Sequence, residues 1–220
     1  MSAFSSIHVT GLDKNVGTVH WRFADRTGKQ VVLEIVDGKA NFYDNPIGVL
    51  TNSPGFQWHL TNLSNYMTLV PGNADGRAWS SLASSFPVKA ASGGSGMYGL
   101  PGDPTSQSRF VRTAVYKATA PVPENGLAAM LQSFKILEAM VVPLGVVVDV
   151  NANPEKTTDM ITSTQFTTVS DIDALKLYYR TMDNSKIRCI DLSAIDFGKV
   201  KYVSAPLDEK KEEVEIIKIK

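Results

Sequence analysis

The chain has 220 residues, of which 43% are hydrophobic and 20% are charged, and its 22 basic side chains balance 22 acidic ones. This length and composition are typical of one globular domain or two small ones. A formal charge of zero gives no reason to expect nucleic acid or an anionic membrane surface as a partner. The single cysteine, Cys189, excludes an internal disulfide. No apolar run approaches the length of a membrane span.

The first part of the chain predicts an antiparallel meander of strands. Residues 18–25 and 30–36 alternate in hydrophobicity and are rich in β-formers, and the turn sequence D-R-T-G separates them. The dipeptide D-G then predicts a tight turn before a third strand at 39–43. A short apolar run at 47–51 predicts one more strand.

Three helices are predicted next, because apolar side chains recur at the helical period. The first follows Pro54 and is expected to bury Phe56, Leu60, Leu63 and Met67, and the others span about 106–118 and about 124–140. The stretch between the first two, 71–103, is rich in Gly, Ser, Ala and Pro and is expected to be a functional or mobile loop. On the last helix we expect five residues to face inward: Leu127, Met130, Leu131, Phe134 and Leu137.

Strands return in the last third of the chain. They are predicted at 165–169, 174–181, 186–192 and 199–204, with a turn at Asp183-Asn184. The order strands, helices, strands indicates the α+β class with antiparallel sheets. Cys189 falls within a predicted strand, where a lone cysteine is typically a small buried hydrophobe and not a nucleophile.

Two patterns are weak as functional signals. The segment 94–99 fits G-x-G-x-x-G, but no strand precedes it and prolines follow it, so we interpret it as a flexible loop. The histidines His8, His20 and His59 show no metal-ligand spacing, and each is interpreted as a surface or packed residue. No metal and no cofactor are therefore predicted.

Two long segments carry most of the functional signal: Y-D-N-P-I-G-V-L-T-N-S-P at 43–54 and Y-G-L-P-G-D-P-T-S-Q-S-R-F-V-R at 98–112. Together with V-H-W at 19–21, F-Q-W-H-L-T-N-L at 56–63 and Y-Y-R-T-M-D-N at 178–184, they resemble the choloylglycine hydrolase family. This family includes bile salt hydrolases and penicillin V acylases.

The resemblance implies a fold and an activity. The fold is the αββα sandwich of N-terminal-nucleophile hydrolases, here incomplete, with antiparallel sheets flanked by helices. The activity is hydrolysis of a linear amide bond. The resemblance divides the chain into a non-matching N-terminal extension (1–17), a partial hydrolase domain (18–206) and a charged C-terminal tail (207–220).

The resemblance also implies site residues. In the family an N-terminal cysteine attacks the amide carbonyl, and its own α-amine acts as the base. By motif match, Asn52 of T-N-S-P is an oxyanion-hole residue and Arg109 of S-R-F-V-R lies near the nucleophile. From the residues alone, the favoured interpretations are a turn or helix-capping residue for Asn52 and a helix-surface ion pair for Arg109.

Substrate contacts are expected from the long loop between the first two helices. Its large apolar side chains are candidates to line the acyl pocket, and packing of the loop onto its own domain is the alternative. The candidates are Trp79, Phe86, Met97 and Tyr98. The motifs do not distinguish a conjugated bile salt from penicillin V as the small-molecule amide substrate.

The family's N-terminal segment, with its cysteine, is expected to be missing, because nothing before Thr18 resembles it. Ser2 is not expected to replace the cysteine, since its neighbours do not match the family's first strand. The chain alone is therefore predicted to be inactive. Three explanations stay open: a truncated amidase, a split enzyme whose second chain carries the cysteine, or an inactive relative that acts as a binding or scaffold component. We expect a bacterial, periplasmic or cytoplasmic homo-oligomer with no nucleic acid or membrane partner.

Overall fold

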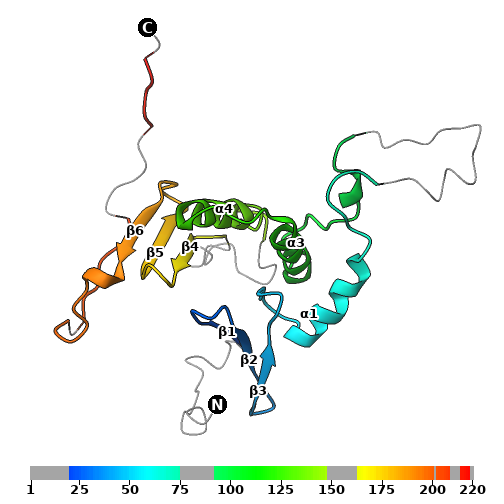
Figure 1. Ribbon diagram of the computed structural model, residues 1–220, viewed down its shortest axis with the longest axis horizontal. Coiled ribbons are helices and arrows are strands. Elements are labelled where there is room, and N and C mark those ends of the chain that lie inside the picture. Colours follow the sequence, from blue (N-terminus) through cyan, green and yellow to red (C-terminus); the bar gives the residue numbers. More distant parts are fainter. Residues whose placement is uncertain (1–19, 75–91, 148–162, 201, 209–213, 219–220) are drawn as a thin grey trace, which may run out of the picture.

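The computed structural model describes residues 20–74, 92–147, 163–200, 202–208 and 214–218. Within these ranges, two antiparallel sheets of three strands each are combined with α-helices and short 3-10 turns (Figure 1). The order of elements is strands, helices, strands, which confirms the predicted α+β class.

The first sheet has the spatial order β1-β2-β3 and is formed by β1 (His20–Ala24), β2 (Gln30–Val36) and β3 (Lys39–Asp44). Asp37 and Gly38 connect β2 to β3 with φ values of +50° and +73°. A two-residue turn with positive φ at both positions follows the right-handed twist of a hairpin. The predicted meander is therefore confirmed for these three strands.

The fourth strand of this meander, predicted at 47–51, is wrong. The Asn45 side chain accepts the backbone N–H of Gly48 at 2.7 Å and donates to the carbonyl oxygen of Val49 at 3.0 Å. These local bonds replace a strand ladder, since short polar side chains compete with regular structure for backbone groups. The irregular backbone instead turns Val49 into the core, where its side chain is 3% exposed.

The helices of the described part are α1 (Phe56–Leu63), α3 (Ser106–Thr119) and α4 (Gly126–Glu138), with 3-10 turns at Ser64–Tyr66, Ser95–Met97 and Leu192–Ala194. All three α-helices agree with the predicted positions. None of these described helices is both long and apolar enough to cross a membrane. Helices α1 and α3 pack against β2 around one buried apolar cluster: Val32, Val49, Phe56, Phe110 and Ala114.

Some predicted inward positions are wrong. Helix α4 buries Met130 and Phe134, but Leu127 is 63% exposed and Leu131 is also exposed. Helix α4 lies against β4 with a narrow face, on which Arg180 of the second sheet covers the Phe134 ring at 5.3 Å. Met67 is likewise exposed, because the α-helix that begins at Phe56 ends before it, at Leu63.

The second sheet, with the order β4-β5-β6, is formed by β4 (Phe166–Asp171), β5 (Lys176–Thr181) and β6 (Arg188–Asp191), beside α4 (Figure 1). The strand predicted at 199–204 is wrong for its described residues, where the backbone N–H groups of Lys199 and Val200 bond back to the Asp196 carbonyl in a turn.

Cys189 lies in a strand as predicted, but it is exposed and not buried. Strand β6 is an outer strand of the second sheet within the described residues, since it pairs with β5 alone. An outer strand has a neighbour on one side only, so fewer groups cover its side chains than on a central strand.

Two chain segments meet at a neck, which we define as residues 70–74 and 94–96. The backbone N–H of Val70 donates to the Gly96 carbonyl, and the N–H of Gly96 donates to the Gly72 carbonyl, both at 3.0 Å. The N–H of Gly94 adds a bond to the Asn73 side chain at 3.0 Å. A Cβ on Gly96 would lie 2.5 Å from the Val70 carbonyl oxygen, so the neck requires glycine at this position.

Candidate functional site

The structure brings Asn52 and Arg109 together. Asn52 is exposed and lies just before α1, and Arg109 lies in the first turns of α3, 57 residues further on. The Arg109 guanidinium donates from Nη2 to the Asn52 side-chain oxygen Oδ1 at 2.5 Å. It also donates from Nε to the carbonyl oxygen of Pro104 at 3.0 Å, which fixes the plane of the guanidinium.

This contact determines which way the Asn52 amide faces. A guanidinium only donates hydrogen bonds, so the oxygen of the amide must be the atom that faces Arg109. The amide nitrogen Nδ2 then points away, and no acceptor for it is found among the residues that the structure describes. Asn52 therefore presents two N–H bonds to the surroundings of the site.

Helix capping by Asn52 and a surface ion pair of Arg109 are not found among the described residues, whereas Asn52 does lie in a bend, as a turn residue would. Asn52 does not cap α1, because the N-cap residue is Gly55 and the backbone N–H of Phe56 donates to the buried carboxylate of Glu34 at 2.7 Å. Arg109 is not a surface ion pair, since within the described ranges it bonds to an amide oxygen and a backbone carbonyl. Burial lowers the pKa of Arg109, with a smaller effect of nearby Arg112, yet an arginine stays charged at neutral pH.

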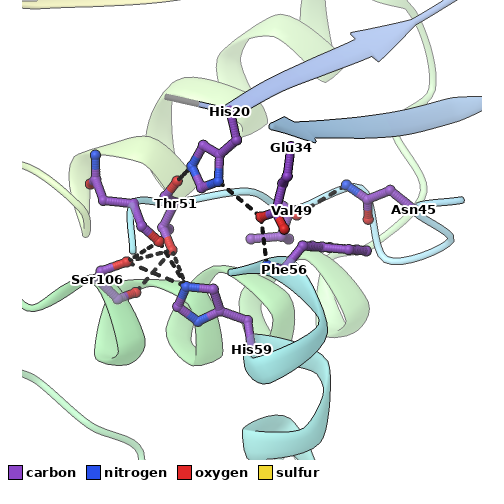
Figure 2. A network of polar contacts seen from close by, with 9 residues as sticks. His20, Glu34, Asn45, Val49, Thr51, Phe56, His59 and Ser106 are labelled. Carbon is purple, nitrogen blue, oxygen red and sulfur yellow. Dashed lines mark hydrogen bonds and ion pairs between the residues drawn. The ribbon is translucent and has the colours of Figure 1, made fainter. Parts of the chain in front are cut away.

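The backbone carbonyl of Asn52 is held by two further side chains. His59 of α1 donates from Nε2 to this oxygen at 2.9 Å, and the Ser106 hydroxyl at the start of α3 lies 2.8 Å from it. His59 is 0% exposed, and its ring stacks on Phe110 with centroids 4.6 Å apart and planes inclined by 10°. Figure 2 shows the His59 ring and Ser106 close together below Thr51, with their hydrogen bonds as dashed lines.

A second histidine holds the neighbouring carbonyl. The ring of His20 on β1 bonds through Nε2 to the carbonyl oxygen of Thr51, and its Nδ1 lies 3.2 Å from the Glu34 carboxylate (Figure 2). The Thr51 hydroxyl donates to the Ser106 carbonyl at 3.0 Å. The turn that carries Asn52 is therefore attached to β1, α1 and α3 at once.

Sequence reasoning missed this network. It interpreted His20 and His59 as unrelated surface or packed residues, because they are far apart in the chain and show no ligand spacing. The fold brings both to consecutive carbonyls, those of Thr51 and Asn52. One signal was available, since His59 lies inside a segment of the family resemblance and on the helix that directly follows Asn52.

The other predicted site residues lie apart from this network or outside the described residues. Met97 is half-buried at the end of the turn Ser95–Met97, and Tyr98 is 73% exposed. Trp79 and Phe86 lie outside the described residues. Within the part of the chain that the structure describes, no group of three His, Cys, Asp or Glu side chains could hold a metal ion.

The second arginine of S-R-F-V-R has a structural contact pattern. Arg112 is buried and donates to three backbone carbonyls, those of Pro101, Asp103 and Ala139. It thus fastens the loop before α3 to the end of α4 through its Nε and Nη1 atoms.

Comparison with known proteins agrees with the fold and with the paired motifs. The sequence model of the linear amide C-N hydrolases, choloylglycine hydrolase family, matches residues 7–208. The chain belongs to this family. A bile salt hydrolase/transferase of Clostridium perfringens is 34% identical over 176 residues, which cover 80% of this chain and 50% of that relative.

Solved structures support the same conclusion. A mutant conjugated bile acid hydrolase of Clostridium perfringens matches with a TM-score of 0.61 and 32% identity, over 79% of this chain and 50% of that one. A penicillin V acylase of Agrobacterium tumefaciens matches with a TM-score of 0.58 and 23% identity, over 80% and 46% of the two chains. The predicted fold class of the N-terminal-nucleophile hydrolase type is confirmed, and the chain spans about half the length of the relatives it matches.

Proposed function

We propose that this chain supplies the charge-stabilising part of a linear-amide hydrolase site of the bile salt hydrolase or penicillin V acylase type. The single observation that carries the proposal is the Asn52–Arg109 contact at 2.5 Å, which leaves the Asn52 amide nitrogen as an outward-facing donor. An amide N–H held in this way is suited to a developing oxyanion, because donors that are oriented in advance need no reorganisation during the reaction.

The proposed chemistry begins with attack of a cysteine sulfur on the amide carbonyl carbon. The C–S bond forms, the carbonyl electron pair moves to oxygen, and the Asn52 Nδ2–H donates to the resulting oxyanion. Collapse of this intermediate breaks the C–N bond, and the amine leaves with the proton taken from the thiol by the cysteine's α-amine. Water then hydrolyses the thioester and releases the acyl group as a carboxylic acid.

Arg109 acts in two ways in this proposal. Its positive charge draws electron density toward Oδ1 of Asn52, which makes the Nδ2–H bonds stronger donors through cooperative polarisation. The same charge favours the anionic forms near it, both the thiolate of the nucleophile and the oxyanion. Partial burial of the guanidinium reduces solvent screening and strengthens both effects.

The nucleophile belongs, in this proposal, to residues other than these 220. The one cysteine of the sequence, Cys189, lies inside β6 and has no α-amine to act as its base. A chain or segment that begins with cysteine is the proposed partner, together with a small acyl amide such as a conjugated bile salt or penicillin V. Assembly as a homo-oligomer and a bacterial source stay part of the proposal.

Complementation tests the proposal. The 220-residue chain is assayed for amine release from a conjugated bile salt and from penicillin V, alone and with the cysteine-starting N-terminal segment of the Clostridium perfringens relative. We expect turnover only in the complemented form. A chain that is equally active alone would contradict the proposal and return attention to Ser2.

Inactivity of both forms would favour the second candidate function. A folded, complemented protein that binds the amide without cleaving it would be an inactive relative that acts as a binding or scaffold component. The matched control is the same N-terminal segment with its first cysteine replaced by alanine, which should bind this chain and restore no turnover.

A further inference from the structure

The Asn52 carbonyl oxygen lies at the meeting point of α1 and α3. Two donors converge on it, His59 Nε2 at 2.9 Å and Ser106 Oγ at 2.8 Å. The side chain of the same residue is held at its other end, because Arg109 binds Oδ1. Asn52 is thus fixed through both its backbone and its side chain, and the direction of Nδ2 follows from these two attachments.

His59 is the less replaceable of the two backbone donors. Its ring lies flat on Phe110, with centroids 4.6 Å apart, and edge-on to Trp58. Packing therefore fixes the ring plane independently of its hydrogen bond. The Ser106 hydroxyl has a single proton and also lies 3.0 Å from the Thr51 hydroxyl, so it is divided between two oxygens. Of these two described donors, His59 is the one whose direction is fixed by the core.

The surroundings of His59 also fix its protonation. The bond to a carbonyl oxygen requires a proton on Nε2, and Nδ1 is buried with no hydrogen-bond partner among the described residues. A proton on Nδ1 would be left unsatisfied. Burial lowers the pKa of His59, with the bond to the Asn52 carbonyl acting in the opposite direction, so the neutral ring is favoured.

We propose that His59 is a positioning residue for the reaction: the neutral Nε2–H tautomer, locked by stacking on Phe110, holds the Asn52 peptide so that the Asn52 amide points at the oxyanion. This inference rests on the proposed function, since it assumes that Asn52 is the donor. His59 touches no reacting atom and acts only through Asn52. Small displacements of such a donor are costly, because about 1 Å of misplacement can reduce a rate by roughly 100-fold.

Nuclear magnetic resonance on the 220-residue chain, complemented with the N-terminal segment whose first cysteine is replaced by alanine, tests the structural half without any turnover. The ¹⁵N shifts of His59 should report a neutral ring protonated at Nε2, and it should stay neutral at pH values where an exposed histidine is charged. Asn52 side-chain signals should be sharp in the native chain, broadened in His59→Leu and restored in His59→Gln, whose amide reaches the same carbonyl. A ring protonated at Nδ1, or Asn52 signals unchanged in His59→Leu, would overturn the proposal.

Kinetics of the complemented protein test the functional half through a double-mutant cycle. We expect His59→Leu to lower kcat about 10-fold to 100-fold with little change in KM, and His59→Gln to restore most of it. In an Asn52→Ala background the additional effect of His59→Leu should nearly vanish, because the group that it positions is gone. Thr61→Val, an exposed position on the same helix, is the control and should match the native rate.

The cycle separates two failures. Full additivity of His59→Leu and Asn52→Ala, or no rescue by glutamine, would show that His59 is merely structural and would overturn this inference alone. An Asn52→Ala variant with native turnover would instead overturn the proposed function on which the inference rests.

Discussion

At the scale of single residues, the notable feature is a pair of side chains that neither charge nor helix capping explains. Arg109 donates one hydrogen bond to the Asn52 side chain and one to the Pro104 carbonyl. Within the described ranges it forms no ion pair with a carboxylate. An arginine that binds a neutral amide gains little stability from the contact, since the strong partners of a guanidinium are anions. We therefore propose that Arg109 stabilises negative charge that develops during a reaction, and not the folded state.

Substitution of Arg109 separates charge from geometry. Arg109→Ala should lower kcat of the complemented protein about 100-fold to 1,000-fold, the range seen when one oxyanion-stabilising group is removed, with the fold intact. Arg109→Lys keeps the charge but loses the planar fork, so we expect an intermediate rate. Steady-state kinetics with circular dichroism make the measurement. Native turnover in a folded Arg109→Ala protein would exclude the assignment.

Cys189 provides the opposite expectation. Although it is exposed, it lies within β6 and not at a chain start, where its own α-amine could act as base, so Cys189→Ser should leave turnover of the complemented protein within about twofold of native. Thiol labelling of the 220-residue chain, before the cysteine-starting segment is added, should likewise spare activity. Loss of turnover in step with labelling of Cys189, in a preparation whose N-terminal cysteine is protected, would contradict the proposed source of the nucleophile.

Only some residues of this site could be predicted from the sequence, and the reason is physical. Asn52 and Arg109 were predicted from motifs that are local in the chain, although their roles stay proposals. His20 and His59 were not connected to them, because their contact depends on how β1, α1 and α3 pack. Hydrogen bonds to backbone carbonyls leave no characteristic residue spacing, in contrast to metal ligands.

At the scale of elements, prediction succeeded where the signal is local. The Asp37-Gly38 turn and the helical periods of α3 and α4 are set by a few neighbouring residues, and these elements were placed correctly. The run at 47–51 has the composition of a strand, but the Asn45 side chain takes its backbone groups. Which face of α4 is buried depended on β4 and β5, distant in sequence, and was predicted only in part.

The start of α3 makes a pH-dependent contribution to stability. The Ser108 hydroxyl, followed by the hydroxyl and backbone N–H of Thr105, lowers the pKa of the Asp103 carboxyl from 3.8 to about 2. The folded state therefore takes up this proton less readily than the unfolded state. The contribution is complete above pH 3.8 and is lost as the pH falls from 3.8 to about 2.

Asp103→Asn should make this contribution visible. At pH 7 we expect a loss of about 1 kcal/mol in unfolding free energy, as for a helix N-cap, and not more because solvent screens this exposed carboxylate. The difference from native should shrink as the pH falls below 3.8. Urea denaturation at several pH values measures it, with Asp183→Asn in an exposed turn as control. A difference that grows toward low pH would contradict the assignment.

At the scale of the whole molecule, both sheets expose large apolar side chains. Phe23 on β1 and Phe166 on β4 are 45% and 58% exposed, and Leu175 and Met182 beside β5 are similarly open. We propose that another polypeptide covers these side chains in the assembled protein. This agrees with a chain that spans about half the length of its relatives.

Dye binding tests this expectation. The isolated chain should increase the fluorescence of a hydrophobic dye and tend to aggregate, because exposed apolar surface and open sheet edges promote association. Addition of the cysteine-starting segment should suppress both effects. An isolated chain that remains monomeric and binds no dye would show that these surfaces do not need a partner.

The neck at residues 70–74 and 94–96 has a consequence for how such a protein can change. Main-chain hydrogen bonds between residues 70–72 and Gly96 hold the two ends of the intervening segment together. The positions of these two ends therefore do not depend on how many residues lie between them. Lengthening a closed loop is inexpensive, at roughly 0.6 kcal/mol for each doubling. If Trp79 and Phe86 contact the acyl group as expected, substrate preference depends on the segment between the two halves of the neck, which we call the cassette. Evolution could then replace the cassette while Asn52, Arg109 and the helices beneath them stay as they are.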